Sequence, residues 1–196
     1  FILWFGWFGF NGGSQLALGS AADAAAMANV YVNTNMAACG GLVAAMILAS
    51  LLYGKVDLTL ALNGALAGLV SITAGPDVAT PLQAILIGAI GGILCTLAIP
   101  LLDKLKIDDV VGAISVHLVA GIWGTLVVGI PGLNGSGDFM TQLIGVVVIG
   151  VFVTVVSAIV WLVLKAVTGL RPSEEEEMTG LDVSELGMEA YPEFRN

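Results

Sequence analysis

Long apolar segments, separated by short polar breaks, set the fold class of this sequence. Five stretches are apolar over roughly the 20 residues that a helix needs to cross a bilayer, and a partial sixth opens the chain. Hydrophobic residues make up 58% of the chain and charged residues 11%, unlike a water-soluble domain of this size. We predict an all-α, polytopic membrane helix bundle with helices at residues 1–18, 24–53, 58–74, 81–102, 110–130 and 139–167.

The basic residues support this segmentation. Cytoplasmic loops of membrane proteins are enriched in Lys and Arg. Here the basic residues follow the second, fourth and sixth segments, and the alternate connections contain none; they are Lys55, Lys104, Lys106, Lys165, Arg171 and Arg195. We therefore expect a multi-pass protein of the cell inner (plasma) membrane with a cytoplasmic C-terminus.

The C-terminal residues differ in character from the rest. We predict a transmembrane domain at residues 1–168 and a cytoplasmic acidic tail at residues 169–196, where four consecutive glutamates lie near Arg171. Composition favours a solvated, partly disordered tail, and docking on the basic loops is the alternative. The chain carries a net charge of −9 and no basic patch, which excludes nucleic acid as a partner. Cys39 and Cys95 lie in apolar segments without metal-ligand spacing, so we expect no metal and no cofactor.

The single histidine is the first candidate for a functional residue. His117 falls near the middle of the segment at residues 110–130, where ionisable groups are costly and usually face a pathway or a partner. Burial disfavours the charged ring, so we expect a neutral imidazole that binds a small polar molecule or relays a proton. A histidine that only hydrogen-bonds to a neighbouring helix is the alternative. Gly121 and Gly124 share its helix face, which fits either close packing or a narrow lumen.

Aromatic residues crowd the first segment, at residues 4–10. Such rings are common at membrane interfaces, and that is one interpretation. The other is a cation-π site, in which ring faces stabilise a small cation and the Ser14 hydroxyl accepts its hydrogen bond. Polar residues within the other segments more often bond across helices, so we expect structural roles for the set Asn33, Thr34, Asn35, Asn63 and Thr73.

Several motifs, taken in order, resemble those of the Amt/Mep/Rh ammonium transporters of the microbial Amt type. They lie at residues 6–14, 33–34, 64–70, 108–109, 116–117, 180–185 and 190–192. The resemblance covers nearly the whole chain and implies the ammonium-transporter fold: an eleven-helix protomer of a homotrimer, built from two inverted repeats and a last helix. Residues 1–196 resemble the second inverted repeat plus the last helix. Because the chain opens at Phe1 inside an apolar run, we expect a cut within a membrane helix.

The resemblance also implies roles for individual residues. Phe10 corresponds to a pore gate, Trp7 and Ser14 to the outer ammonium-binding site, and His117 to one of two pore-lining histidines. It implies a PII-type regulatory protein as a partner at the cytoplasmic face. Two positions depart from the family pattern: Leu118 stands where a glycine is usual, and Leu186 where many relatives have a histidine.

These observations predict transport of ammonium or ammonia through a narrow hydrophobic pore. The outer site selects and deprotonates the cation, and ammonia passes His117. An ammonium sensor that signals through its cytoplasmic tail is the alternative. An intramembrane enzyme is disfavoured, because no second titratable residue accompanies His117 within its segment.

Overall fold

The computed structural model describes residues 1–194; Arg195 and Asn196 lie outside them, so the position expected for Arg195 is not tested. The described residues form helices without strands, which confirms the all-α class. Two compact units divide within one helix, between Val148 and Ile149. The elements are α1 (Ile2–Gly13), α2 (Ala21–Tyr53), α3 (Leu58–Ile72), α4 (Pro81–Lys104), the π-helix η1 (Ile114–Val119), α5 (Ala120–Val127), α6 (Phe139–Val167), α7 (Glu174–Thr179), α8 (Leu181–Leu186) and the 3-10 helix η2 (Pro192–Phe194).

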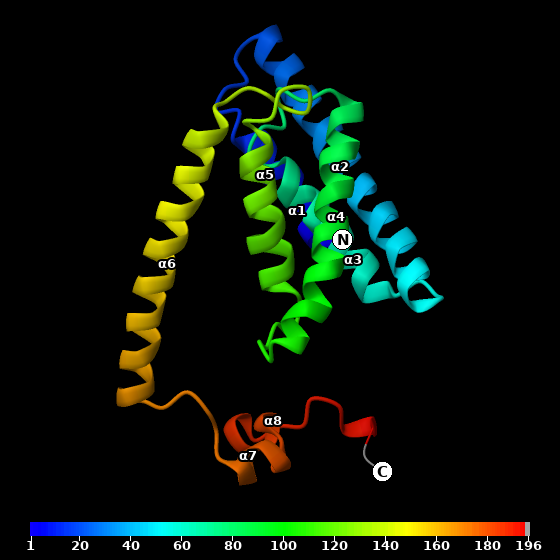
Figure 1. Ribbon diagram of the computed structural model, residues 1–196. Helices are drawn as coiled ribbons and strands as arrows, with labels where there is room; N and C mark the ends of the chain where they lie inside the picture. Colours follow the sequence, from blue (N-terminus) through cyan, green and yellow to red (C-terminus); the bar gives the residue numbers. More distant parts are fainter. Residues whose placement is uncertain (195–196) are drawn as a thin grey trace. The chain divides into compact units, whose positions relative to one another are not determined.

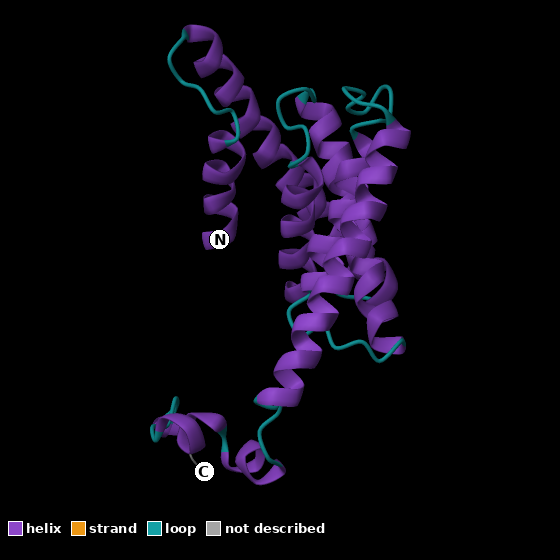
Figure 2. Cartoon of the chain, turned by 90° about the vertical axis from the view of Figure 1, so that its left-hand side faces the viewer, coloured by secondary structure: helices purple, strands orange, loops and turns teal. Residues whose placement is uncertain are grey.

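Three helices form the centre of the first unit. α2, α3 and α4 pack against one another, and η1 and α5 pack on α3 and α4 (Figure 1). α1 runs alongside the first part of α2 and also contacts α3 (Figure 2). The core between them holds small and aliphatic side chains, among them Ala37, Ala67, Leu69 and Ile87.

Glycine permits the close approach of α2 and α4. A Cβ added to Gly88 would overlap the carbonyl oxygen of Ala37, and one added to Gly92 would overlap that of Gly41. Helices in lipid are held together largely by such van der Waals contact, because no water is expelled between them. This packing fits the bundle of membrane helices predicted from the sequence.

The helices differ in length from the predicted segments. α2, α4 and α6 are long and apolar enough to cross a membrane, whereas the segments predicted at residues 58–74 and 110–130 form shorter apolar helices, Leu58–Ile72 and Ile114–Val127. A helix of 15 residues such as α3 covers about 22 Å at about 1.5 Å per residue, less than the roughly 30 Å of hydrocarbon. α3 begins at Leu58 as predicted, where Asp57 caps it by accepting a hydrogen bond from the Leu60 N–H at 2.8 Å. It is shorter at its end, because the Thr73 N–H bonds to the Val70 carbonyl oxygen and the helix stops at Ile72.

Capping residues also set the starts of the long helices. α2 begins at Ala21, earlier than predicted, because Ser20 and Asp23 form a capping box that satisfies two backbone N–H groups. α4 begins at Pro81 as predicted, after a second capping box formed by Thr80 and Gln83.

The second unit contains the rest of α6 and the tail. α7 starts with a capping box in which the Glu176 carboxylate accepts a hydrogen bond from the Ser173 N–H at 2.7 Å. The Asp182 carboxylate accepts one from the Ala190 N–H at 2.9 Å, which ties α8 to the residues before η2. Up to Phe194 the tail thus contains the short helices α7, α8 and η2.

Candidate functional site

His117 lies in a wide helical turn rather than in a regular α-helix. Residues Ile114–Val119 form the π-helix η1, which continues directly into α5. A π-helix is rare and occurs mostly as a single turn, often at a functional site. The regular helix predicted for residues 110–130 missed this turn, because apolar periodicity does not distinguish it from an α-helix.

Asp109 holds the start of η1. Its carboxylate accepts hydrogen bonds from the backbone N–H groups of Ile114 and Ser115, each at 3.0 Å, and from the Ser115 hydroxyl at 3.1 Å. Gly112, with φ at +76°, provides the left-handed turn that this loop requires. Burial raises the pKa of Asp109, but these hydrogen bonds outweigh it and hold the pKa below its usual value. The carboxylate therefore fixes the turn that carries His117.

A pocket of about 300 Å³, termed the aromatic pocket, brings together three of the predicted site residues: Trp7, Phe10 and His117. The Trp7 and His117 rings are stacked, with centroids 6.3 Å apart and 13° between their planes. The Phe10 ring lies 5.8 Å from that of Trp7 at an angle of 57°. The remaining lining residues, all uncharged, are Val70, Thr73, Ala74, Gly121, Gly124 and Thr125.

Trp7 is held in position by α3 and the residue that follows it. The indole N–H donates a hydrogen bond to the Thr73 hydroxyl at 2.8 Å, and that hydroxyl donates to the Leu69 carbonyl oxygen at 2.7 Å. Sequence reasoning gave Thr73 a structural role only. It lines the aromatic pocket and orients a site residue, which no pattern in the sequence signals.

Gly121 and Gly124 line the same pocket as His117, in agreement with the predicted face, but they serve different purposes. A Cβ added to Gly124 would lie 2.6 Å from the Ser71 carbonyl oxygen, whereas one added to Gly121 would lie 3.7 Å from Val70 Cγ1. Gly124 thus permits close packing of α5 on α3, and Gly121 keeps space open in the pocket.

Ser14 is the predicted site residue that does not line the aromatic pocket. It follows the end of α1, and its exposed hydroxyl donates a hydrogen bond to the Phe10 carbonyl oxygen at 2.9 Å. Phe10 itself is 61% exposed. The Ser14 oxygen can still accept a hydrogen bond, so a cation at this end of α1 would find an acceptor there.

Two buried amides bond to segments far away in sequence, Asn33 to the loop between α3 and α4 and Asn11 to another helix. The Asn33 amide donates to the Pro76 carbonyl oxygen at 2.8 Å. The Asn11 amide donates to the Thr34 hydroxyl at 2.9 Å, which fastens α1 to α2. These bonds agree with the structural roles expected for Asn33 and Thr34, and the bond to Thr34 positions the helix that carries Trp7 and Phe10.

The sequence model of the Ammonium Transporter Family matches residues 1–191 of the chain. The chain belongs to this family. "Ammonium transporter Amt2" of Archaeoglobus fulgidus is 41% identical over 99% of the chain and 44% of its own length. "Ammonium transporter" of Bacillus subtilis is 34% identical over 97% of the chain and 49% of its length.

Solved structures give the same family fold. A structure described as "Sensor Amt Protein" matches with a TM-score of 0.84 and 39% identity over 93% of the chain and 46% of that protein. Candida albicans Mep2 matches with a TM-score of 0.79 and 28% identity over 98% of the chain and 47% of that protein. The chain spans less than half the length of each of these four proteins.

In this member of the ammonium transporter family, Leu118 stands beside the histidine where a glycine is usual. Its side chain lies outside the aromatic pocket. Leu118 is 54% exposed and is absent from the lining of the aromatic pocket. A larger residue at this position therefore leaves the space around His117 unchanged. The family motif at residues 64–70 lies on α3, where Val70 contributes to the lining.

Proposed function

We propose that this chain forms part of a transporter that moves ammonium or ammonia across a membrane, and that the aromatic pocket lies on its path. The observation that carries this proposal is the single uncharged pocket shared by Trp7, Phe10 and His117. Membership of the ammonium transporter family supports the choice of substrate.

The chemistry of the pocket suggests how the substrate passes. An ammonium ion cannot enter an apolar pore intact without a large desolvation cost. The Trp7 and Phe10 ring faces stabilise the cation, and the Ser14 oxygen accepts one of its hydrogen bonds. The ion transfers its proton to solvent water at this exposed outer site, and ammonia passes the Phe10 gate and then the neutral His117 ring. Potassium is excluded because it has no N–H to donate and no proton to lose.

The relatives imply a larger assembly. We infer that residues 1–168 span the inner (plasma) membrane as the second inverted repeat and last helix of a homotrimeric protein, with residues 169–196 as its cytoplasmic tail. The position of Lys55, Lys104 and Lys165 after alternate segments supports this orientation. A PII-type regulator at the cytoplasmic face is part of the same proposal.

A chimera tests the transport proposal. Residues 1–191 replace the matching segment of Archaeoglobus fulgidus Amt2, and uptake of ¹⁵N-ammonium is measured in cells that lack their own ammonium transporters. We expect uptake by the parent chimera, and loss of ammonium-selective uptake in His117→Ala. Leu118→Ala, next in sequence but outside the aromatic pocket, should transport normally. Unchanged selective uptake in His117→Ala contradicts the proposed path.

A sensor is the second candidate, favoured by the similarity to the structure described as "Sensor Amt Protein". In that case binding at the aromatic pocket would change the tail, and flux would be negligible. Deleting residues 169–196 from the chimera separates the two functions. If the chain is a transporter, ammonium uptake persists after the deletion, because the route lies in the membrane domain. If it is a sensor, the deletion removes the ammonium-dependent output, and uptake is small before and after it.

A further inference from the structure

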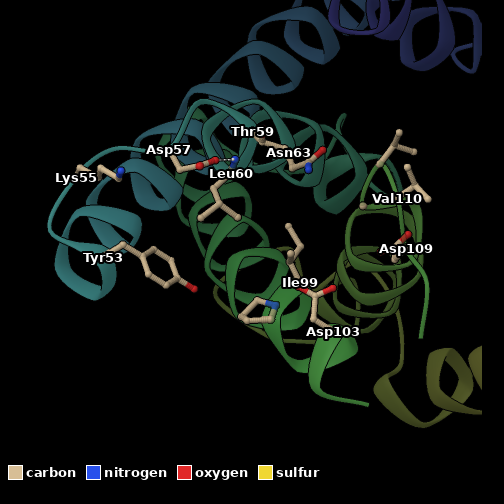
Figure 3. A pocket seen from close by; sticks show the side chains of 13 residues that line it. Tyr53, Lys55, Asp57, Thr59, Leu60, Asn63, Ile99, Asp103, Asp109 and Val110 are labelled. Atoms are coloured by element: carbon tan, nitrogen blue, oxygen red, sulfur yellow. Dashed lines mark hydrogen bonds between the residues drawn. The ribbon is translucent and has the colours of Figure 1, made fainter. Parts of the chain in front are cut away.

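A second pocket, of about 420 Å³, lies where the ends of α2 and α4 meet the start of α3 and the loop before η1 (Figure 3). Its charged lining residues are Lys55, Asp57, Asp103 and Asp109, and we term it the acidic pocket. Three carboxylates and one lysine side chain give the acidic pocket a net negative charge, so the pocket attracts cations.

The three carboxylates differ in how they are used. Asp57 caps α3 through the Leu60 N–H, and Asp109 holds η1 through Ile114 and Ser115. The Asp103 side chain makes no hydrogen bond or ion pair with any of residues 1–194. Asp103 is therefore the carboxylate best placed to bind a ligand.

Asn63 gives independent support for a ligand. It lines the acidic pocket and is only 7% exposed, yet its side-chain amide has no hydrogen-bond partner among residues 1–194. Its Nδ2 would lie 2.8 Å from a Cβ added to Gly112, so the amide faces another residue of the pocket lining. Its amide atoms are not fully enclosed, unlike Asn11 Oδ1 and Asn33 Oδ1, so they reach the space of the pocket, where a ligand can bond to them.

The acidic pocket lies along the same helices as the aromatic pocket. On α3, Asn63 lines the acidic pocket and Val70, two helical turns later, lines the aromatic pocket. Seven residues of helix cover about 10 Å. Gly112, in the loop before η1, lines the acidic pocket, and His117, within η1, lines the aromatic pocket. The two pockets therefore lie at different heights along α3 and the segment that carries η1.

We propose that the acidic pocket binds ammonium at the end of the bundle that carries Lys55. Substrate leaves through this end after passing His117, or enters through it before reaching His117. This inference rests on the proposed function for the choice of cation. The ammonium ion offers N–H donors on all sides, which match the Asp103 carboxylate and the Asn63 carbonyl oxygen.

A thiol placed in the pocket tests this binding without relying on transport. Thr59 lines the acidic pocket and is exposed, so Thr59→Cys in the Amt2 chimera should react with a cationic methanethiosulfonate reagent. Ammonium chloride should slow that reaction severalfold relative to choline chloride at equal ionic strength. Asp103→Asn should raise the ammonium concentration that gives half protection by about tenfold, because the free carboxylate is lost.

Matched variants separate binding from other effects. Lys104→Gln changes a neighbouring charge outside the pocket lining and should leave protection intact. Asp103→Glu keeps the carboxylate and should restore protection if Asp103→Asn removes it. A thiol at Leu105, exposed and outside the lining, should show no ammonium protection. Size-exclusion chromatography confirms that each variant is folded.

The outcomes distinguish the site from the proposed function. Protection that depends on Asp103, in a chimera without ¹⁵N-ammonium uptake, upholds the site and rejects transport. Normal uptake without protection, or protection that persists in Asp103→Asn, overturns the site. Absence of protection in a folded chimera overturns it whatever the uptake result.

Discussion

The aromatic pocket and the acidic pocket share α3 and the η1 region but have opposite chemistry. The first is lined by rings, small side chains and two threonine hydroxyls, and the second by three carboxylates and a lysine. Asp109 serves both, because it lines the acidic pocket and fixes the turn that carries His117. The contrast teaches that charged side chains line one of these two pockets and are absent from the lining of the other. Such a division suits a path on which the cation is held at an end and a neutral molecule moves past the rings.

Removing the shared residue should have the largest effect. Asp109→Ala leaves the Ile114 and Ser115 N–H groups and the Ser115 hydroxyl without their acceptor. We expect a loss of on the order of 3 kcal/mol in the free energy of unfolding of the chimera, since these are bonds to a charged group. Thermal unfolding followed by tryptophan fluorescence measures it. Asp108→Ala, at the exposed neighbouring position, serves as the control, and equal melting of both variants would show that Asp109 does not fix η1.

A pair of glycine substitutions tests the aromatic pocket alone. In Gly124→Ala the new methyl group meets the Ser71 carbonyl oxygen, so we expect destabilisation by about 1–3 kcal/mol. In Gly121→Ala the methyl group meets Val70 at ordinary contact distance, and stability should be unchanged or rise by up to about 1 kcal/mol. Thermal unfolding of the two variants gives the comparison. The reverse order of stability would contradict the packing described for α5.

The hydrogen bond that orients Trp7 should have a smaller effect. Thr73→Val removes the acceptor of the indole N–H at similar side-chain volume, which should cost about 1 kcal/mol and raise the ammonium concentration for half-maximal uptake. Thr96→Val is the control, because the Thr96 hydroxyl bonds to the Gly92 carbonyl oxygen of its own helix and lies outside the aromatic pocket. If both variants take up ammonium like the parent, Trp7 needs no orientation by Thr73.

The smallest effect is expected from pH. The pKa of Asp109 is lower in the folded chain than its usual value, so its charged form adds stability that is complete above the unfolded pKa of about 3.9. That contribution is lost as the pH falls below about 4 and through the folded pKa. Unfolding measured between pH 6 and about 3 should show this loss in the parent and a weaker one in Asp109→Asn. Identical pH profiles would remove Asp109 as the cause.

Sequence reasoning located the helices and most of the aromatic pocket because both follow from simple patterns. Apolar length predicted the membrane segments, and the resemblance selected Trp7, Phe10 and His117, which the structure brings into one pocket. Ser14 stays a prediction, since it lies beside Phe10 but outside the lining.

Other features depend on contacts between distant residues and leave no local signal. The π-turn depends on Asp109 reaching Ile114 and Ser115, and apolar periodicity cannot show a change in helical hydrogen bonding. The role of Thr73 depends on an indole 66 positions away in sequence. The acidic pocket gathers residues from four segments, so no single stretch of sequence marks it.

The π-turn gives the histidine an unusual sensitivity to chain length. A π-helix closes each turn with one residue more than an α-helix, so removing one residue between Ile114 and Val119 would let the segment close as an ordinary helix. Because the turn would give up only its extra residue, α5 would keep its orientation, whereas a deletion in a regular helix of 3.6 residues per turn rotates the two sides by about 100°. A single-codon deletion in η1 should thus preserve the bundle while moving the imidazole relative to the indole.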